Sequence, residues 1–523
     1  MYNKIRINGA GRGRRNGVTM ANSIYAAINI NSNDLSMKIY EISKQYGIHE
    51  LTHVRRKLSL FTETYRKEFI SYQTVSEICS TLNDFKRIMA GFDVDSEQVY
   101  VTSELRETQN SFVVIDQIKV QTGFKVKVIS NSEARFLYYK ALTLETNVFN
   151  LLTHDTTLLV DIDAGSVQLS IFQSGKLTAT QNLRLGSARI RELLIVVQEE
   201  AYDFNALIDE YIEKDLVLFK RLYLNNIEIH HIIVIGEMIP DIYYYLKSQN
   251  PDFDGHVSKK LLNRKKLPKE LFSGSEKAAL FLPTVLICRK ISRLTSCDDL
   301  SMSCIDLSDG MSADFAEKKV KFKLGHDFVQ DILSSAEHIA QKYKSDMNHI
   351  ENVQTLALQI FDRIRKLHGL GKRERLLLQI SVILHSCGTY INELQSRECS
   401  YRIIMSTEII GISHKERAII ANVVRYNKDS FPDYTELADE FTREDYITIV
   451  KLNAILKTAN VLDKSNRQKI KNVGVALEDG ILTITADTMA DITLEKGLFH
   501  DKANVFQEVF GIRPILRQKR TGR

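Results

Sequence analysis

Apolar and polar residues alternate in the same way in two stretches of the chain. Residues 24–41 contain two β-rich runs on either side of a short polar turn, which predicts a β-hairpin. Residues 157–162 and 167–172 repeat this order of strand, polar turn and strand about 130 residues later. The recurrence predicts two related α/β subdomains that face each other across a cleft.

Apolar residues elsewhere recur at helical spacing. This spacing predicts helices at residues 73–93 and 106–122, with short strands at 99–102 and 125–129. From about residue 326 the pattern is almost entirely helical, in the segments 326–343, 350–367, 374–385, 401–411, 414–426 and 444–463. A last hairpin is predicted at 473–485, with Asp479-Gly480 in its turn.

These patterns divide the chain into five parts. They are a basic tail at 1–22, two α/β subdomains at 23–150 and 151–310, a helical domain at 320–465 and a C-terminal appendage at 466–523. Residues 1–19 are rich in Gly and Arg and contain no apolar stretch, so we expect a disordered tail rather than a signal peptide, with Met20 as an alternative start.

Composition narrows the class of protein. The net charge of +5, from 70 basic and 65 acidic residues among 523, is too small to indicate a specific nucleic-acid binder. The six cysteines form no CxxC pair, which argues against a disulfide scaffold or a zinc site and favours the cytoplasm. The chain has no run of about 18 apolar residues, so we expect no membrane span.

The two polar turns are candidate phosphate sites. Backbone N–H groups at the turn between two strands can hold a phosphate, and carboxylates beside it can hold Mg²⁺. The first turn covers residues 29–33 (NINSN), and the second covers residues 161–168 (DIDAGSVQ). Turns of this composition are common, so either one alone is a weak indication.

Further segments make the pattern specific. Residues 101–110 (VTSELRETQN), 129–135 (ISNSEAR) and 183–187 (LRLGS) resemble, in order, segments of the exopolyphosphatase / guanosine pentaphosphate phosphohydrolase family. Residues 367–370 (LHGL), 384–385 (LH) and 425–426 (RY) are similar to the helical HD-type domain of that family. The resemblance runs from about residue 24 to about residue 512.

The resemblance implies two actin-like, hsp70-like (ribonuclease H-like) α/β subdomains, followed by a helical HD-type domain and a small C-terminal α/β appendage. It also implies release of terminal orthophosphate from inorganic polyphosphate or guanosine pentaphosphate, with Mg²⁺ or Mn²⁺ as cofactor, in a homodimer. Carried over residue by residue, it assigns general base catalysis to Glu133, phosphate binding to Arg106, and metal binding to Asp161. Ser32 and Asn33 in the first turn and Gly165 and Ser166 in the second would bind phosphate.

Several positions depart from the family pattern. Asn29 replaces a metal-facing Asp, and Asn31 replaces a Gly in the first turn. Asp163 replaces a Gly in the second turn, where two charges about 4 Å apart would repel by roughly 4 kcal/mol, unless Asp163 binds the metal instead. In the helical domain, Ser386 and Asn460 replace carboxylates, so a metal site at His349 and His385 is not expected.

Two hypotheses follow. The first is an exopolyphosphatase-type hydrolase in which Glu133 positions the attacking water. The second is an inactive relative that binds polyphosphate or an alarmone nucleotide (guanosine penta- or tetraphosphate) as a regulator. The surviving set of Glu133, Arg106 and Asp161 favours the first hypothesis, and the substitutions at both turns favour the second.

Overall fold

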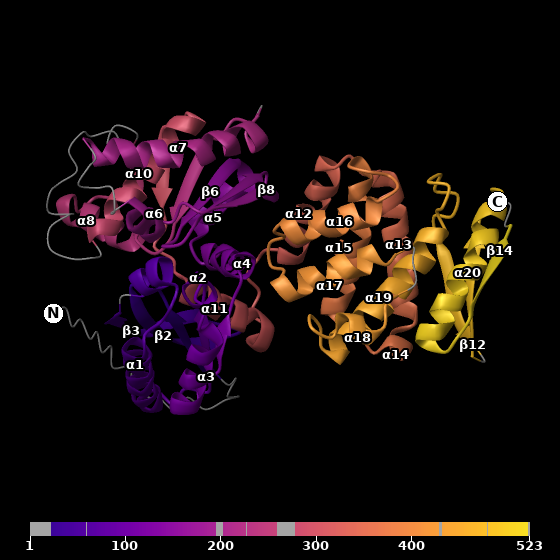
Figure 1. The fold of residues 1–523 in the computed structure, drawn as a ribbon, viewed down its shortest axis with the longest axis horizontal. Helices are drawn as coiled ribbons and strands as arrows, with labels where there is room; N and C mark the ends of the chain where they lie inside the picture. The colour runs from indigo at the N-terminus through magenta and orange to yellow at the C-terminus, as the bar shows by residue number, and fades with distance from the viewer. Residues whose placement is uncertain are drawn as a thin grey trace. The chain divides into compact units, whose positions relative to one another are not determined.

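The computed structural model describes residues 22–58, 60–194, 202–225, 227–258, 278–427, 431–478 and 480–520, and the predicted tail lies almost entirely outside them. The chain forms two compact units, which Figure 1 shows from indigo to yellow. Unit 1 is Met1–Asp327 and unit 2 is Phe328–Arg523. Each is described by itself.

The first sheet of unit 1 begins with the predicted hairpin. Its strands are β1 (Ser23–Ile30), β2 (Asp34–Ser43), β3 (Gly47–Lys57), β4 (Ser96–Val101) and β5 (Val126–Val128), in the order β3-β2-β1-β4-β5. Strands β1 and β2 pair antiparallel, with Asn29 opposite Ser36, and β4 joins β1 in parallel. The helices that accompany the sheet are α1 (Tyr72–Gly91), α2 (Ser103–Arg106), α3 (Ser111–Thr122) and α4 (Asn131–Leu142).

The second sheet repeats this plan. Its strands are β6 (Thr156–Ile162), β7 (Val167–Gln173), β8 (Lys176–Leu183), β9 (His231–Ile235), β10 (His256–Ser258) and β11 (Asp299–Met302), in the order β10-β11-β9-β6-β7-β8. Its helices are α5 (Thr146–His154), α6 (Ser187–Leu194), α7 (Phe204–Tyr223), α8 (Ile239–Gln249) and α10 (Ala278–Thr295), and α11 (Leu307–Phe315) follows the sheet in the chain. The run β8-β7-β6-β9-β11 matches β3-β2-β1-β4-β5 strand for strand, which confirms the predicted pair of related subdomains.

Each sheet has its own buried core. Alternating apolar residues of the first sheet, such as Ile28 and Met37, pack on the apolar face of α1, including Ile78 and Phe85. Helix α1 begins where the Ser71 side chain accepts a hydrogen bond from the Thr74 N–H group. The second sheet packs on α7 and α10 around a separate cluster.

Two features of unit 1 differ from the sequence prediction. The helix expected at 106–122 is broken between α2 and α3, because the Asn110 side chain bonds both backbone polar groups of Ile70, at 3.0 and 2.8 Å. Helix α11, which lies near the expected domain boundary, belongs to unit 1 and packs on α4 and β1. A Cβ atom at Gly310 would lie 2.3 Å from the Leu137 carbonyl oxygen, so α4 and α11 meet at their backbones.

Unit 2 contains the predicted helical domain. Its helices are α12 (Phe328–Lys342), α13 (Met347–Arg363), α14 (Arg365–His368), α15 (Lys372–Leu384), α16 (Ser396–Ser406), α17 (His414–Arg425), α18 (Tyr434–Leu437), α19 (Arg443–Val461) and α20 (Thr493–Phe510). The predicted hairpin is β12 (Val473–Glu478) with β13 (Ile481–Asp487), and β14 (Pro514–Lys519) completes the sheet in parallel to β13. Within the described part of the chain, no helix is long and apolar enough to cross a membrane.

Candidate functional site

The first polar turn joins β1 to β2 in unit 1. Its carbonyl groups are used by the chain that follows β3, since the Leu58 and Leu60 N–H groups donate to Asn33 and Ser32 at 3.0 and 2.7 Å. The Asn31 side chain accepts from Asn29 at 2.5 Å and donates to Asp34 at 2.8 Å. The Ser32 and Asn33 carbonyl groups are therefore occupied. The donors of the same two residues, the Ser32 hydroxyl and the Asn33 N–H groups, bond a different partner.

Those donors bind the carboxylate of Glu237. The Ser32 hydroxyl donates to Glu237 Oε2 at 2.6 Å, and Asn33 donates to Oε1 from its backbone N–H at 3.2 Å and from its side chain at 2.9 Å. Ser32 and Asn33 are the predicted phosphate ligands, and a carboxylate is an anion with similar hydrogen-bonding chemistry. The first turn thus forms an anion site that a carboxylate of the same chain fills.

Backbone geometry places Glu237 at this position. Glu237 follows β9, and the preceding residue, Gly236, has a positive φ of 128°. A Cβ atom at Gly236 would lie 2.2 Å from the Ile162 carbonyl oxygen, so only glycine lets this segment run against the end of β6. Glu237 was not predicted from the sequence. A Gly-Glu pair directly after the buried strand residues 231–235 was the available signal, because ligands of α/β sheets gather at strand ends.

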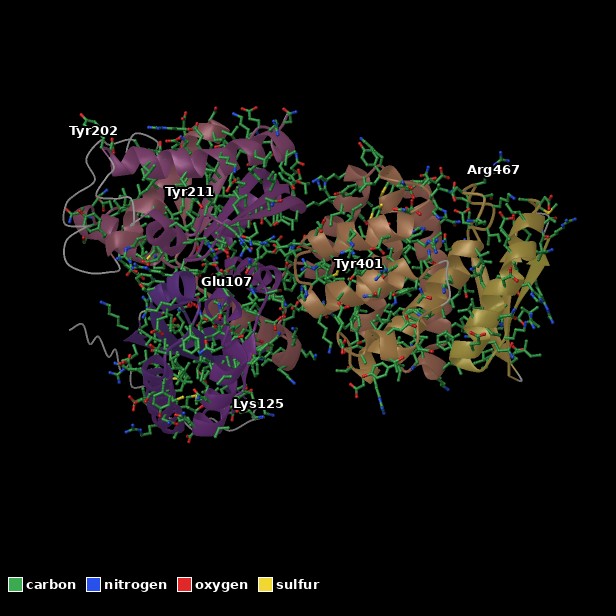
Figure 2. The ribbon with its side chains drawn as sticks, viewed as in Figure 1. Glu107, Lys125, Tyr202, Tyr211, Tyr401 and Arg467 are labelled. Atoms are coloured by element: carbon green, nitrogen blue, oxygen red, sulfur yellow. The ribbon has the colours of Figure 1, made fainter. Side chains whose placement is uncertain are left out.

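The second polar turn, between β6 and β7, is bound by the start of α6. The Ala188 and Arg189 N–H groups donate to the Ala164 carbonyl at 3.0 and 3.1 Å, and Arg189 Nε donates to the Gly165 carbonyl at 2.9 Å. Arg189 also pairs with Glu107, which Figure 2 labels and which follows α2. The Asp163 N–H group donates to the Ser166 carbonyl at 3.0 Å, so a local bond closes the turn.

Asp161, the predicted metal ligand, is 1% exposed, and neither of its carboxylate oxygens has a hydrogen-bond partner among the described residues. Burial raises the pKa of Asp161 to about 7, against the opposing charge of Arg135. The Asn29 Oδ1 atom is likewise buried without a hydrogen-bond partner among the described residues. Oxygen groups of this kind are ligands that Mg²⁺ accepts, but Asn29 lines the cavity described below, whereas Asp161 is not among its described lining residues. The described residues contain no group of three or more His, Cys, Asp or Glu that would form a closed metal cage.

Glu133 and Arg106, the predicted catalytic residues, lie together beside the start of α4. Glu133 Oε2 accepts from the Ser130 N–H and hydroxyl groups at 2.9 and 3.0 Å, and Oε1 pairs with Lys127 at 2.9 Å. Arg106 donates to Asn131 Oδ1 at 2.6 Å and to the Ile129 carbonyl at 3.2 Å. Glu133 is therefore engaged as the capping-box residue of α4.

A cavity of about 290 Å³ lies beside the two turns and includes Asn29, Asn31 and Asp163 in its lining. Its charged lining residues are the cations Lys38 and Arg55 and the carboxylates Glu50, Asp163, Glu237 and Asp306. Neither Glu133 nor Arg106 is among the described residues that line it.

The cations of this cavity are already paired. Lys38 lies 2.9 Å from both Asp306 and Asp309, and Arg55 pairs with Asp34. Burial alone would lower the pKa of Lys38, but the two aspartates raise it overall. Burial and the neighbouring Asp309 raise the pKa of Asp306 to about 6. The cavity is therefore acidic, and a polyphosphate needs accompanying cations to enter it.

In unit 2 the two predicted histidines lie together. The His349 and His385 ring centroids are 5.3 Å apart, and His349 lies 2.8 Å from Asp463 and 3.2 Å from Asn460. His385 Nδ1 donates to the Val382 carbonyl at 2.6 Å. A binuclear metal site does not fit these residues, because Asp463 and Asn460 occupy both ring nitrogens of His349 and His385 Nδ1 is bonded to a backbone carbonyl.

Comparison of the sequence with known proteins agrees with this architecture. Residues 38–313 match the Ppx/GppA phosphatase family, and residues 333–503 match domain III of Ppx/GppA phosphatases. The chain is 21% identical over 421 residues to the guanosine-5'-triphosphate,3'-diphosphate pyrophosphatase of Photobacterium profundum, covering 79% of this chain and 82% of that protein.

Two solved structures are similar in fold. An exopolyphosphatase from Cytophaga hutchinsonii superimposes with a TM-score of 0.51 at 18% identity, covering 58% of this chain and 100% of that chain. The Ppx/GppA family member of Aquifex aeolicus has a TM-score of 0.47 at 19% identity, covering 58% of this chain and 99% of that one. The predicted fold class, actin-like α/β subdomains followed by a helical domain and a small α/β appendage, is confirmed. Because the family match spans more than half of its residues, the chain belongs to the Ppx/GppA phosphatase family.

Proposed function

We propose that this protein binds a phosphoanhydride in the cavity of unit 1, and that it serves as a binding or regulatory member of its family rather than an efficient hydrolase. The ligand is inorganic polyphosphate or guanosine penta- or tetraphosphate, bound together with Mg²⁺ or Mn²⁺. The observation that carries this proposal is the hydrogen bonding of Ser32 and Asn33 to Glu237. The donors that would hold a phosphate are arranged for an anion, and Glu237 competes for them.

The ligand and Glu237 exclude each other at the first turn. A phosphate that bonds Ser32 and Asn33 places its charge about 4 Å from the Glu237 carboxylate, a repulsion of roughly 4 kcal/mol at an effective dielectric constant near 20. Binding therefore requires the Glu237 side chain to rotate away. A divalent cation would neutralise part of the phosphate charge, and Asp161 with Asn29 supplies the oxygen atoms to hold it.

The contacts of Glu133 also argue against efficient hydrolysis. To activate water as a general base, its carboxylate must face the phosphoryl group within hydrogen-bond distance of the water. Both of its oxygens instead bond Ser130 and Lys127. Moving Glu133 into an attacking position would break the capping box of α4, at a cost of about 1 kcal/mol, and would also break the ion pair.

The second candidate is the hydrolase that the sequence predicts. Asp161 favours it, because a buried carboxylate whose two oxygens lack partners among the described residues is a fitting ligand for a catalytic Mg²⁺. In that case Glu237 and Glu133 must both change position when substrate binds.

Binding and turnover, measured side by side, separate the two candidates. Binding of tripolyphosphate and of guanosine pentaphosphate to the protein is measured by calorimetric titration, first in the presence of Mg²⁺ and then of Mn²⁺. Orthophosphate release from the same two ligands is measured under the same conditions. We expect the unaltered protein to bind, and to release no more orthophosphate than Glu133→Gln. Glu237→Ala, which frees the three donors, should bind about tenfold more tightly or better. Ser32→Ala should bind more weakly, because it removes a donor.

The matched control is Glu210→Ala, which removes an exposed glutamate on α7 and should leave both measurements unchanged. Orthophosphate release that Glu133→Gln abolishes would establish the hydrolase instead. Absence of binding in both the unaltered protein and Glu237→Ala, with either metal, would contradict both candidates.

A further inference from the structure

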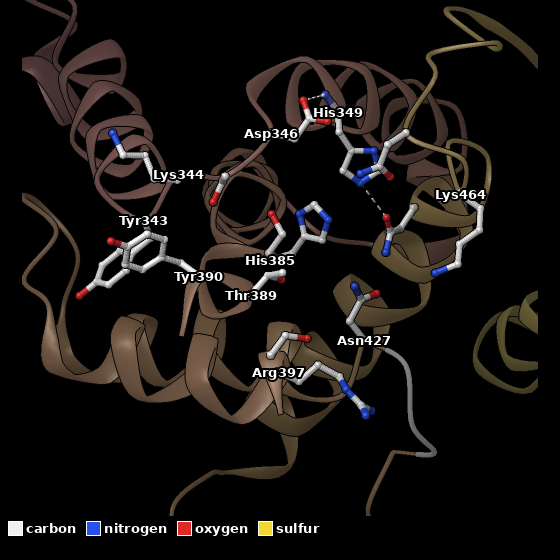
Figure 3. A pocket seen from close by; sticks show the side chains of 15 residues that line it. Tyr343, Lys344, Asp346, His349, His385, Thr389, Tyr390, Arg397, Asn427 and Lys464 are labelled. Carbon is white, nitrogen blue, oxygen red and sulfur yellow. Dashed lines mark hydrogen bonds between the residues drawn. The ribbon is translucent and has the colours of Figure 1, made fainter. Parts of the chain in front are cut away.

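Unit 2 contains a second pocket, of about 390 Å³, around the two histidines (Figure 3). Residues after α12, at the start of α13, after α15 and after α17 contribute to its lining, and Asn460 adds the C-terminal end of α19. This volume falls within the range of pockets that bind small molecules. The pocket is separate from the cavity of unit 1, with which it shares no lining residue.

The charged residues of this pocket are mainly basic. Lys344, Arg397 and Lys464 line it, whereas Asp346 is the single carboxylate among the described lining residues. The Asp346 carboxylate caps α13, because it accepts hydrogen bonds from the Asn348 and His349 N–H groups at the start of that helix, both at 3.1 Å. Within the described part of the chain, Lys344 and Lys464 form no ion pair. The lining of the pocket therefore carries an excess of positive charge.

Several polar groups in the pocket lack partners. Asn427 is 5% exposed, and its Oδ1 atom has no hydrogen-bond partner among the described residues. The same holds for the hydroxyl groups of Ser345 and Ser386. A buried polar group without a partner costs about 1 to 3 kcal/mol, which a bound polar ligand recovers. A hydroxyl or a rotated side-chain amide can donate to an anion.

A metal ion does not account for these groups. Both ring nitrogens of His349 are bonded, Nδ1 to Asp463 at 2.8 Å and Nε2 to Asn460 at 3.2 Å, and His385 Nδ1 donates to the Val382 carbonyl. Ser386 and Asn460 stand where the HD-type pattern has carboxylates. Because neither residue carries a negative charge, and three of the charged lining residues are basic, the pocket favours an anion over a cation.

Figure 3 shows the arrangement of the polar and aromatic groups. Lys464 and Asn427 lie on one side of the pocket, His385 lies near its middle, and Tyr343 and Tyr390 lie close together on the other side. The two tyrosine rings meet edge to face at 6.2 Å between centroids, and Tyr390 is 63% exposed. An exposed aromatic ring beside a basic hollow offers a stacking surface for a flat heterocycle.

We propose that this pocket binds a nucleoside monophosphate or a similar nucleotide without a metal ion. Lys464, Asn427 and His385 hold the phosphate, and Tyr390 stacks on the base. Charge-assisted hydrogen bonds from lysine to phosphate provide most of the affinity, and stacking provides the preference for a nucleotide over bare phosphate.

The test is calorimetric titration of the full chain with GMP, AMP and inorganic phosphate in the presence of EDTA. We expect the nucleotides to bind without metal and more tightly than phosphate. Lys464→Ala should weaken binding of nucleotides and phosphate alike by about tenfold. Tyr390→Ala should weaken the nucleotides by about fivefold and leave phosphate unchanged. Lys471→Ala, an exposed lysine outside the pocket, is the matched control and should change nothing.

Three outcomes would overturn the proposal. The first is an absence of nucleotide binding at millimolar concentration, and the second is a requirement for Mg²⁺ or Mn²⁺. The third is binding that Ser32→Ala weakens and Lys464→Ala leaves intact, which would place the ligand in the cavity of unit 1. Since Lys464 is exposed, loss of folding is not expected to obscure the result, and thermal unfolding of each variant checks this directly.

Discussion

Single residues in this protein take their roles from their contacts rather than from their type. Glu133 has the chemistry of a general base, yet it caps α4 and pairs with Lys127. Glu237 lies in no motif recognised in the sequence, yet it occupies the donors of the first turn. Several hydrogen bonds from fixed donors restrict the rotation of a carboxylate, so both glutamates are held in their present positions.

Lys140 and Asp314 form a buried pair that permits a test at the residue scale. Lys140 is 2% exposed and donates to Asp314 at 2.8 Å, and it also pairs with Glu317. Burial would raise the pKa of Asp314, but Lys140 and Lys318 lower it overall. Because the folded pKa is below the ordinary value of 3.8, the pair stabilises the fold above about pH 4, and this stability is lost as the pH falls through the folded pKa.

Asp314→Asn should therefore destabilise unit 1 by about 3 kcal/mol at pH 7, because it leaves the buried Lys140 with a weaker partner set. The difference from the unaltered protein should shrink as the pH falls from about 4 towards the lower folded pKa, at which Asp314 in the folded protein becomes protonated. Urea unfolding at both pH values measures this. Asp116→Asn, on the exposed side of α3, is the control and should stay within about 0.5 kcal/mol. An equal loss at both pH values would show that charge is not the cause.

At the scale of elements, the close contact between α4 and α11 places α11, which follows the second sheet in the chain, against the first sheet of unit 1. Helix α11 follows the second sheet in the chain but packs on α4 and β1. It therefore couples the two subdomains whose turns build the cavity. The absence of a side chain at Gly310 is what permits the contact, since the Leu137 backbone occupies that space.

Gly310→Ala should therefore destabilise unit 1 by about 3 kcal/mol, although alanine is the better helix former, because the backbones of two helices must separate. Gly497→Ala is the matched control. It also lies within a helix, α20, but a Cβ atom there meets nothing within 4 Å, so the substitution should stabilise unit 2 by about 0.5 to 1 kcal/mol. Thermal unfolding compares the two variants. A neutral result at Gly310 would mean that α4 and α11 can shift without cost.

At the scale of the whole molecule, the division after Asp327 separates two units with their own buried side chains. Each of the nine helices described in unit 2 contributes buried residues, for example Ile360 on α13, Leu378 on α15 and Leu456 on α19. The cavity of unit 1 and the pocket of unit 2 are each lined by residues of a single unit. Each unit therefore contains its own candidate binding site.

A fragment of residues 328–523 should consequently fold on its own. We expect a helical circular dichroism spectrum and one cooperative thermal transition, because the buried contacts of the helical domain are internal to it. The fragment's nucleotide affinity should match that of the full chain. A gradual, non-cooperative transition would show that unit 2 depends on unit 1 for its stability.

Much of the fold followed from the sequence, because the signals involved are local. Alternation over a few residues predicted the hairpins at residues 24–41, 157–172 and 473–485, and the pairing of their strands confirms them. Helical periodicity predicted α1 and the main helices of unit 2, and ordered motifs predicted the family. Their exact ends, the break after Arg106 and the place of α11 were not predicted, because contacts with distant segments set them.

The candidate site likewise has features that follow from the sequence and features that only the tertiary structure reveals. The sequence by itself determined which residues form the two polar turns and which of them depart from the family pattern. It did not determine what those residues contact. Glu237 lies 205 positions from Ser32, and no local pattern relates the two. The basic character of the unit 2 pocket likewise arises where Lys344, Arg397 and Lys464 come from separate segments. Only the tertiary structure decided these features, because electrostatic competition and burial depend on distances in space, which the order of residues along the chain does not contain.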